Sequence, residues 1–348
     1  MNFRKTIAAL LCGAVALGTA SCGSGESASP MASSFAGDPN KIQVVCQNFP
    51  AYDWVRELTK GREDKFEITY LLDKGTDMHS FQPTADDVLR ISGCDLFVYV
   101  GGESDKWAED AIAGASNKNM KAVSLLKTIG SAAKTEEVKE GMQAEEEHDH
   151  DHEEESGEHH DEHSEHSEAP EYDEHIWLSL KNAGTVCDLL ASELSALDKE
   201  GKDTVSGNLS AYREKLNALD SQFKSLADGA KNKTLIFGDR FPFRYFTEDY
   251  GFDYYAAFVG CSAETEASFE TITFLAAKAD ELGAKNIYKI ESGDGRIAQA
   301  IIDSTKSKDA KIVTLDSIQS VNADRVKNGE TYLSIMQKNY EVLKETVA

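Results

Sequence analysis

Positively charged side chains are scarce in this chain of 348 residues, which has 36 Lys and Arg against 61 Asp and Glu. The formal net charge is therefore −25 at pH 7. An acidic balance of this size argues against binding to nucleic acid, and against binding to anionic lipid through a basic face. It favours a ligand that is a cation.

Lys and Arg are absent altogether between Glu145 and Glu174, where 16 acidic residues and seven of the nine histidines are concentrated. Because this segment has almost nothing apolar to bury, it cannot fold alone, and we expect a disordered insert over residues 142–174. Closely spaced imidazoles and carboxylates offer many weak, exchangeable sites for divalent cations. A solvated acidic loop is the alternative, but it leaves the histidines unexplained. The candidate ligands of this auxiliary metal loop are His148, His150, His152, His159, His160, His163 and His166.

Long hydrophobic runs are also lacking, and the apolar run from Ile7 to Leu17 is too short to span a bilayer. With Arg4 and Lys5 before it and small residues after it, the run predicts a signal peptide over residues 1–21. The sequence TASC that ends at Cys22 resembles a bacterial lipobox, in which this cysteine is lipidated; an ordinary cleaved signal is the alternative. Residues 22–40, rich in Ser, Gly and Ala, indicate a flexible tether between a lipid anchor and the folded part.

Cysteine is infrequent, with six in the whole chain. Once Cys12 is removed with the signal peptide and Cys22 is lipidated, four thiols remain, which permit up to two disulfides in three pairings. Their spacing contains no CxxC, which argues against a thiolate metal site. The four are Cys46, Cys94, Cys187 and Cys261.

Strand and helix patterns alternate in two separate series, which predicts an α/β fold with mostly parallel sheets. The first series forms an N-terminal lobe over residues 41–141, with strands at 41–46, 66–72, 95–100 and 122–125 and helices at 51–60, 84–92 and 107–116. A turn is expected at Phe49 and Pro50, and the spacing of Thr84 and Asp87 predicts a capping box at the second of these helices. The second forms a C-terminal lobe over residues 231–348, with strands at 234–238, 252–258, 286–290 and 311–315 and helices at 243–250, 268–282, 296–304 and from 330.

Residues 175–230 are expected to link the two lobes by helices. One helix is predicted at 182–197, and apolar residues then recur at steps of three and four from Val205 to Leu226. This second pattern predicts one long amphipathic helix, which at about 24 residues would span roughly 36 Å. The expected architecture is two Rossmann-like lobes joined by one long rigid helix.

Ligands of open α/β sheets bind beyond the carboxyl ends of the strands. Two imidazoles and two carboxylates occur at such places, namely His79, His175, Asp239 and Glu291. Each has a structural alternative: His79 as a capping residue of a loop, Asp239 as a partner of a nearby arginine, and Glu291 as an acid that begins a helix. Together they predict a metal site in the crevice between the lobes, which would suit Zn²⁺ and also accept Mn²⁺.

Several motifs at and around these residues resemble the metal-binding lipoproteins of bacterial zinc and manganese ABC importers. The motifs are FPAYDWV at 49–55, His79 in its glycine-containing loop, DLFVYVG at 95–101, DEHIWLS at 173–179, SAETEAS at 262–268 and ETYLSIMQKN at 330–339. The resemblance covers essentially the whole mature chain. It implies two α/β lobes bridged by a long helix, with a metal ion held between them.

The resemblance carries the ligands over unevenly. His79 and His175 match the first two histidines of the family, and Glu291 stands where a carboxylate ligand is expected. The zinc-binding members have a third histidine where this chain reads GDRFPFRY at 238–245, which places Asp239 or Arg240 there. A guanidinium stays protonated and cannot ligate, so Asp239 is the choice, with a histidine of the acidic segment as the alternative. The carboxylates resemble manganese members and the His-rich loop resembles zinc members; we favour zinc.

The implied function is high-affinity capture of a divalent metal, most of all zinc, outside the cytoplasm, without catalysis. The metal would be passed to the membrane permease of an ABC importer by a monomeric, exported and lipid-anchored protein, in the periplasm or on the outer face of the cytoplasmic membrane. A manganese-specific protein of the same type and a metal-binding surface adhesin or storage protein are the alternatives.

An enzyme is a rival of another class. The segment GDGRIA at 293–298 follows a predicted strand and opens a helix, with Asp316 at a suitable distance for ribose recognition. Against a nucleotide site, the segment lies in the last quarter of the chain, and Glu291 beside it would repel a pyrophosphate. A metallohydrolase is disfavoured because there is no HExxH motif.

Overall fold

A computed structural model describes residues 37–143, 171–262 and 264–347. The predicted signal peptide, the lipidation of Cys22 and the seven histidines of the acidic segment lie outside these residues, as does most of the predicted tether. Within the described residues, no helix combines the length and the apolar character that crossing a membrane requires.

The first lobe is built on a four-stranded parallel sheet in the order β2-β1-β3-β4. Its strands are β1 (Ile42–Cys46), β2 (Phe66–Tyr70), β3 (Leu96–Tyr99) and β4 (Lys121–Ser124), and its helices are α1 (Phe49–Leu58), α2 (Ala85–Gly93), α3 (Lys106–Ala113) and α4 (Leu125–Ile129). The predicted strands are confirmed to within two residues. Helix α4 was not predicted, because five residues are too few for a periodic pattern.

Helix α1 begins at Phe49, two residues before its predicted start. The expected turn at Phe49 and Pro50 is wrong, because proline is well tolerated in the first turn of a helix, where its missing N–H would have no partner. The side chain of Asn48 caps this helix by accepting the N–H of Ala51 at 3.1 Å. At α2 the predicted capping box between Thr84 and Asp87 is confirmed.

The second lobe repeats the same strand order, β6-β5-β7-β8, again with parallel pairs. Its elements are β5 (Thr234–Phe241), α7 (Arg244–Tyr250), β6 (Asp253–Val259), α8 (Phe269–Leu282), β7 (Asn286–Ile290), α9 (Arg296–Ser304), β8 (Lys311–Leu315), α10 (Ala323–Lys327) and α11 (Tyr332–Thr346). Strand β5 runs three residues beyond its predicted end at Gly238, with an irregular register between Phe237 and Arg240. Asp239 therefore lies within this irregular part of the strand.

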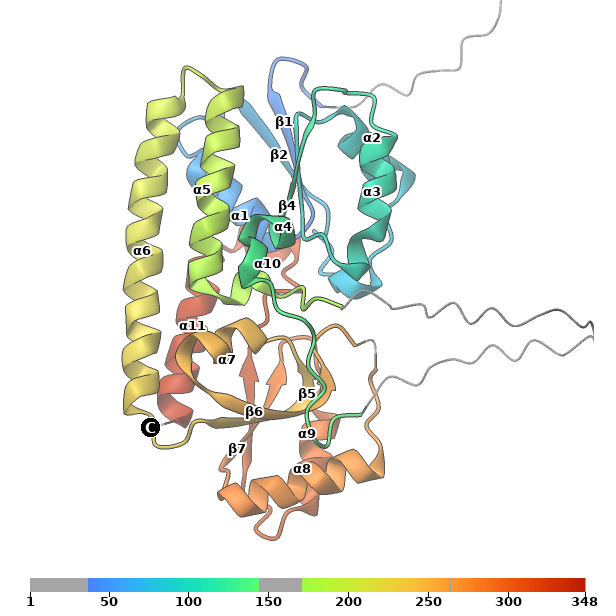
Figure 1. The fold of residues 1–348 in the computed structure, drawn as a ribbon, viewed down its shortest axis with the longest axis vertical. Helices are drawn as coiled ribbons and strands as arrows, with labels where there is room; N and C mark the ends of the chain where they lie inside the picture. Colours follow the sequence, from blue (N-terminus) through green and yellow to red (C-terminus); the bar gives the residue numbers. More distant parts are fainter. Residues whose placement is uncertain (1–36, 144–170, 263, 348) are drawn as a thin grey trace, which may run out of the picture. The chain divides into compact units, whose positions relative to one another are not determined.

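Two long helices pack side by side and connect the lobes, α5 (Leu180–Leu197) and α6 (Lys202–Gly229) (Figure 1). Helix α6 has 28 residues and spans roughly 42 Å. Its buried stripe includes Tyr212, Leu216 and Phe223, as the apolar spacing predicted.

One hydrophobic core runs through both lobes, and a second, smaller cluster lies within the second lobe. The indole N–H of Trp177 donates to the carbonyl of Ser317 at 2.8 Å, and the hydroxyl of Tyr70 donates to the carbonyl of Val321 at 2.7 Å. Tyr332, the first residue of α11, packs edge-on against Trp54 of α1 with ring centroids 5.2 Å apart. Burying each of these aromatic side chains contributes about 1.5–3 kcal/mol. We infer that the core resists large movement of one lobe against the other.

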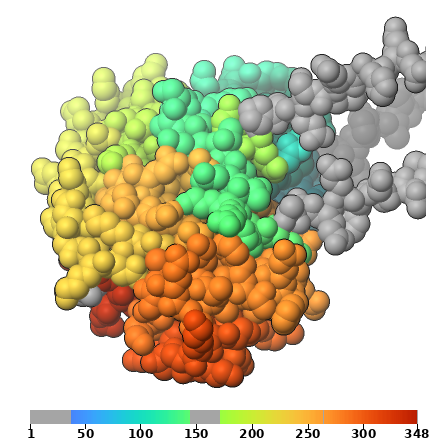
Figure 2. All heavy atoms as spheres, turned by 60° about the horizontal axis from the view of Figure 1, so that its bottom comes forward, coloured from blue at the N-terminus to red at the C-terminus, as the bar shows by residue number. Residues whose placement is uncertain are grey.

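The segment that follows α4 crosses from the first lobe to the second. The N–H of Lys134 donates to the hydroxyl of Tyr245 at 3.0 Å, and the N–H of Gln143 donates to the carbonyl of Ala257 in the edge strand β6 at 2.9 Å. Figure 2 shows this green segment lying on the orange surface of the second lobe. Thr135 also forms a bridge with Tyr172. Both boundaries of the undescribed residues 144–170 are thus held against folded structure.

Candidate metal site

Two buried histidines face each other where the lobes meet. His79 lies in a short 3₁₀ turn, η1 (Met78–Ser80), whose cap residue Asp77 accepts the N–H of His79 at 3.0 Å. His175 directly precedes a second 3₁₀ turn, η4 (Ile176–Leu178). Their Nε2 atoms are 3.1 Å apart, and the side chains are only 4% and 0% exposed.

Oxygen atoms hold the other nitrogen of each ring. Nδ1 of His175 lies 3.0 Å from a carboxylate oxygen of Asp173, so this nitrogen carries the proton and donates. Nδ1 of His79 lies 2.8 Å from the hydroxyl of Ser104, with a carboxylate oxygen of Glu174 at 3.6 Å. Metal-binding histidines are fixed in this way. Two imidazoles on one tetrahedral zinc ion place their nitrogens about 3.3 Å apart, close to the observed separation.

Burial and neighbouring groups set the charge of the pair. Burial and then the adjacent His175 hold the pKa of His79 well below its usual range, so this imidazole is neutral at neutral pH. Burial opposes charge on His175 as well, but Asp173 and Glu136 outweigh it and raise the pKa of His175. Burial raises the pKa of Glu174 to about 7. A neutral imidazole beside several carboxyl groups is an environment that favours a bound cation.

Cys261 completes a cluster with the two histidines. It follows β6 by two residues, and one potential ligand atom from each of Cys261, His79 and His175 lies within 4.8 Å of the other two. Among the residues that the structure describes, it is the one group of at least three His, Cys, Asp or Glu side chains whose ligand atoms lie close enough to share a metal ion. All four cysteines that the structure describes are free, so neither of the permitted disulfides forms.

The predicted ligand Asp239 lies outside this cluster. Its carboxylate accepts the N–H of Arg240 at 2.9 Å and the N–H of Ile290 at 3.1 Å, and burial raises its pKa. One of its oxygens closely overlies Gly293, where a Cβ atom would come within 2.0 Å of it. The carboxylate therefore joins the ends of two neighbouring strands, β5 and β7. Its role as a ligand stays a prediction.

Glu291 is held by the loop after β8. Its carboxylate accepts hydrogen bonds from the hydroxyls of Ser317 and Ser320 at 2.8 and 2.9 Å and from the N–H of Ser317 at 2.7 Å. The same loop contains Ile318 with a φ of 63°, a conformation that a β-branched residue rarely adopts. Glu291 thus stabilises a strained loop, and its role as a ligand also stays a prediction.

Gln319, in this strained loop, was not predicted as a site residue. Its side chain is 3% exposed, and it lies near enough to His79 to act on the pKa of that imidazole. Neither polar atom of its amide makes a well-formed hydrogen bond within the protein. An amide left in this state is costly unless another group satisfies it. Sequence reasoning could not find it, because nothing before the fold places residue 319 beside residue 79.

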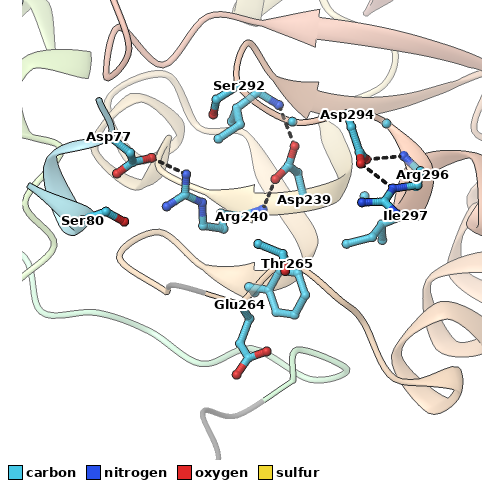
Figure 3. Close-up of a pocket in the computed structure, with 15 residues that line it drawn as sticks. Asp77, Ser80, Asp239, Arg240, Glu264, Thr265, Ser292, Asp294, Arg296 and Ile297 are labelled. Atoms are coloured by element: carbon cyan, nitrogen blue, oxygen red, sulfur yellow. Dashed lines mark hydrogen bonds and ion pairs between the residues drawn. The ribbon is translucent and has the colours of Figure 1, made fainter. Parts of the chain in front are cut away.

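A cavity of about 450 Å³ opens next to the cluster. Figure 3 shows Arg240 at its wall, directed at Asp77, with Asp239 beside the loop that carries Ser292. Arg240 pairs with Asp77 and donates to the carbonyl of Ser262 at 3.1 Å. It therefore connects the loop of His79 to the loop of Cys261. That Arg240 is not a ligand stays a prediction.

The glycine-rich segment of the rival nucleotide hypothesis also lines this cavity. There the side chain of Asp294 accepts the N–H of Arg296 at 2.8 Å, at the first residue of α9. The N-terminus of this helix, which a nucleotide phosphate would need, is thus already occupied by a carboxylate.

Comparison with known proteins gives a consistent picture. A family model described as "Zinc-uptake complex component A periplasmic" matches residues 44–346. The chain is 27% identical over 309 residues to the zinc-binding protein AdcA of Streptococcus pyogenes, which covers 88% of this chain but 56% of that protein. It is 28% identical over 345 residues to the high-affinity zinc uptake system protein ZnuA of Bacillus subtilis, covering 99% and 98% of the two chains.

Solved structures share the fold. The Zn(II)-bound ZnuA-like domain of Streptococcus pneumoniae AdcA superposes with a TM-score of 0.65 at 23% identity, covering 88% of this chain and 99% of that one. This confirms two α/β lobes with parallel sheets. The chain spans about half the length of the AdcA protein of Streptococcus pyogenes that it matches.

Proposed function

Because the chain belongs to the family of periplasmic zinc-uptake components, we propose that it captures zinc outside the cytoplasm and delivers it to the permease of an ABC importer. The observation that carries this proposal is the histidine pair, with Nε2 atoms 3.1 Å apart and both Nδ1 atoms held by oxygen. The arrangement leaves two lone pairs directed at one point. Nothing in it activates a substrate, so we propose binding and release without catalysis.

Zinc is favoured over manganese by the donor atoms. Imidazole nitrogen suits zinc, whereas manganese prefers sites rich in carboxylate and water oxygen. The relatives from Streptococcus pyogenes and Bacillus subtilis carry names that specify zinc.

The remaining features of the proposal rest on the sequence. We propose that Asp239 and Glu291 are carboxylate ligands from the second lobe, that lipidation at Cys22 anchors a monomer to the membrane, and that the seven histidines of the acidic segment collect weakly bound metal. The proposed carboxylates and His79 come from different lobes, so displacing the ligand loop of one lobe would release the ion without the large lobe movement that the shared core resists.

Metal binding by the purified protein tests the proposal. Protein prepared without added metal should contain zinc, and competition with a chelator should show one tight zinc site. Replacing His79 by alanine should weaken that site at least about tenfold. Removing a group that only orients a metal ligand already costs about that much affinity, and removing the ligand itself should cost no less. His163→Ala, the same change within the acidic segment, is the matched control and should leave the tight site unaltered. A tight step that survives His79→Ala unchanged would remove this histidine from the site.

A further inference from the structure

We propose that Cys261 is the third protein ligand, binding the metal as a thiolate from the second lobe. The inference rests on the proposed function, because it concerns the same ion held by His79 and His175. It adds a sulfur donor, which the absence of a CxxC motif had argued against. The observation that supports it most directly is that potential ligand atoms of these three residues lie within 4.8 Å of one another.

The backbone around Cys261 is shaped to approach His175. The preceding residue is Gly260, where a Cβ atom would come within 3.1 Å of the imidazole and 2.9 Å of the carbonyl of Phe241. Any larger residue would displace the imidazole or the strand end. The absence of a side chain at this position therefore allows the end of β6 to lie against the histidine, and the next residue is the cysteine.

Contacts from both lobes fix the cysteine loop. Arg240 donates to the carbonyl of Ser262 at 3.1 Å and pairs with Asp77, which in turn accepts the N–H of His79. On the other side, the N–H of Cys261 donates to a carboxylate oxygen of Glu136 at 3.2 Å. These contacts hold the thiol and the imidazole of His79 in one arrangement. A cysteine that served only to fill space would not need them.

Buried polar groups around the cluster point independently to a ligand at this site. Gln319, beside His79, is 3% exposed, with both amide atoms lacking a well-formed hydrogen bond. Glu174 is 1% exposed, and its Oε2 atom has no hydrogen bond, although it lies 3.6 Å from His79 Nδ1. Groups left in this state are costly unless a charge or water satisfies them. A cation bound by the three ligand atoms would supply a charge next to Glu174, and water bound to that cation would lie near Gln319.

The distances fit a tetrahedral zinc ion after a small movement of the thiol. With Zn–N near 2.05 Å and Zn–S near 2.3 Å, a sulfur and a nitrogen ligand lie about 3.6 Å apart. The three ligand atoms are already within 4.8 Å, so closure needs a shift of about 1 Å at most. In this step a metal–sulfur bond forms and the S–H bond breaks, and the proton leaves to solvent. No oxidation occurs, and the fourth position of the tetrahedral ion takes either water or one of the two proposed carboxylates, Asp239 or Glu291, but not both.

A thiolate would make this site selective. Thiolates are soft ligands that bind zinc strongly and manganese poorly. The sulfur would therefore compensate in the second lobe for the arginine at position 240, and it would do so in favour of zinc. The inference thus assigns metal specificity to a residue outside the four that the sequence indicates.

Cys261→Ser tests this by changing one atom. We expect zinc affinity to fall at least about tenfold, with manganese affinity changed less than about twofold. Cys94→Ser is the matched control, because Cys94 is buried just before β3, at the end of the sheet opposite the site. In the parent protein, cobalt should give a sulfur-to-metal charge-transfer band that Cys261→Ser removes and Cys94→Ser keeps.

A second measurement needs no variant. Cys261 is the one partly exposed cysteine residue among the four that the structure describes, so alkylation at alkaline pH, where a thiol of raised pKa begins to ionise, followed by peptide mapping should label it in the metal-free protein. Zinc should suppress that labelling. If Cys261→Ser binds zinc as tightly as the parent protein and shows the same cobalt spectrum, or if zinc does not reduce the labelling of Cys261 in the parent protein, the cysteine is not a ligand. If the parent protein binds no zinc at all, the proposed function fails instead.

Discussion

The two lobes have the same strand order, yet the ends of their sheets carry different chemistry. In the first lobe and the segment that enters the linking helices, His79 and His175 are buried and oriented by oxygen partners at Nδ1, with their Nε2 atoms 3.1 Å apart. In the second lobe, Asp239 lies in the irregular end of β5 and Glu291 follows β7, but their carboxylates accept hydrogen bonds from the lobe itself. The same strand order therefore does not place the same chemistry at the ends of the two sheets.

The difference arises because the carboxylates of the second lobe already serve as acceptors for N–H and hydroxyl groups of their own loops. Asp239 sits at the irregular end of β5 and accepts two backbone N–H groups, which would otherwise lack partners. The carboxylate of Glu291 accepts hydrogen bonds from the strained loop after β8. By contrast, the oxygens around His79 bind nitrogen atoms that a metal does not need. We infer that the first lobe is prepared for the ion, while the second lobe contributes chiefly through the loop after β6.

The largest expected effect is that of pH on zinc affinity. Its size reports how many protons the ligands of each lobe release when the metal binds. His79 has a lowered pKa and is already neutral, so it releases no proton on binding. His175 has a raised pKa, and below that pKa it must lose one proton to bind. Burial raises the pKa of Cys261 well above its ordinary value, so its thiol loses one proton throughout.

Affinity should therefore fall as pH falls, by about tenfold per pH unit above the pKa of His175 and about a hundredfold per unit below it. Competition titrations between pH 8 and pH 5, corrected for the chelator's own protons, measure this slope. Cys261→Ser should reduce the slope by one proton at every pH. A slope of one or less in the parent protein at low pH would mean that the second lobe adds no titrating ligand.

A smaller effect is expected from the carboxylates, and it decides whether the second lobe binds metal through oxygen. If Asp239 is a ligand, Asp239→Ala should weaken zinc and manganese alike, several-fold each, because oxygen serves both metals. Asp239→His should shift selectivity further toward zinc. Competition titrations with both metals measure this. Should Asp239→Ala bind both metals as the parent protein does, its carboxylate serves β5 and β7 alone, and the contrast between the lobes stands.

Glu291→Gln is the matched comparison for Asp239. It keeps the size of the side chain but replaces a carboxylate oxygen by an N–H₂ group that the loop after β8 cannot satisfy. A loss of thermal stability in the metal-free protein would then accompany any loss of affinity. A loss of affinity alone would favour direct ligation by Glu291.

Much of this fold was readable from the sequence, because its signals are periodic or local. β7, α9 and β8 have their predicted limits, and the capping box of α2 is where the spacing of Thr84 and Asp87 placed it. The errors lie where one sequence feature is compatible with two structures. The proline after Phe49 predicted a turn, but it lies in the first turn of a helix.

The site was only half readable, for a physical reason. His79 and His175 were identifiable because histidine is rare outside the acidic segment, and because His79 comes after a predicted strand while His175 begins the predicted linking region. Cys261 gave no such signal, since a metal-binding thiol is recognised by spacing along the chain, and its partners here are 86 and more residues away. Only the folded arrangement brings the three together. The carboxylates were chosen by position, and position does not reveal which hydrogen bonds a carboxylate already accepts.

The smallest effect on the tight site is expected from deleting residues 145–170, which contain all seven histidines of the acidic segment. Both boundaries are fixed independently, since Gln143 donates to Ala257 and Asp173 donates to the carbonyl of Lys134 at 2.8 Å. A flexible Gly-Ser linker between them should therefore leave His175 in place.

We expect the tight zinc affinity of this deletion variant to change less than about twofold, while the number of weakly bound ions falls, because scattered imidazoles add capacity rather than one defined geometry. Equilibrium dialysis over a range of zinc concentrations separates the two classes of site. A linker of the same length as the deleted segment, with its acidic residues kept and its histidines replaced by serine, distinguishes imidazole from charge. If either variant lost the tight step, a histidine of the segment would be the ligand that we assign to the second lobe, and the contrast between the lobes would have to be drawn again.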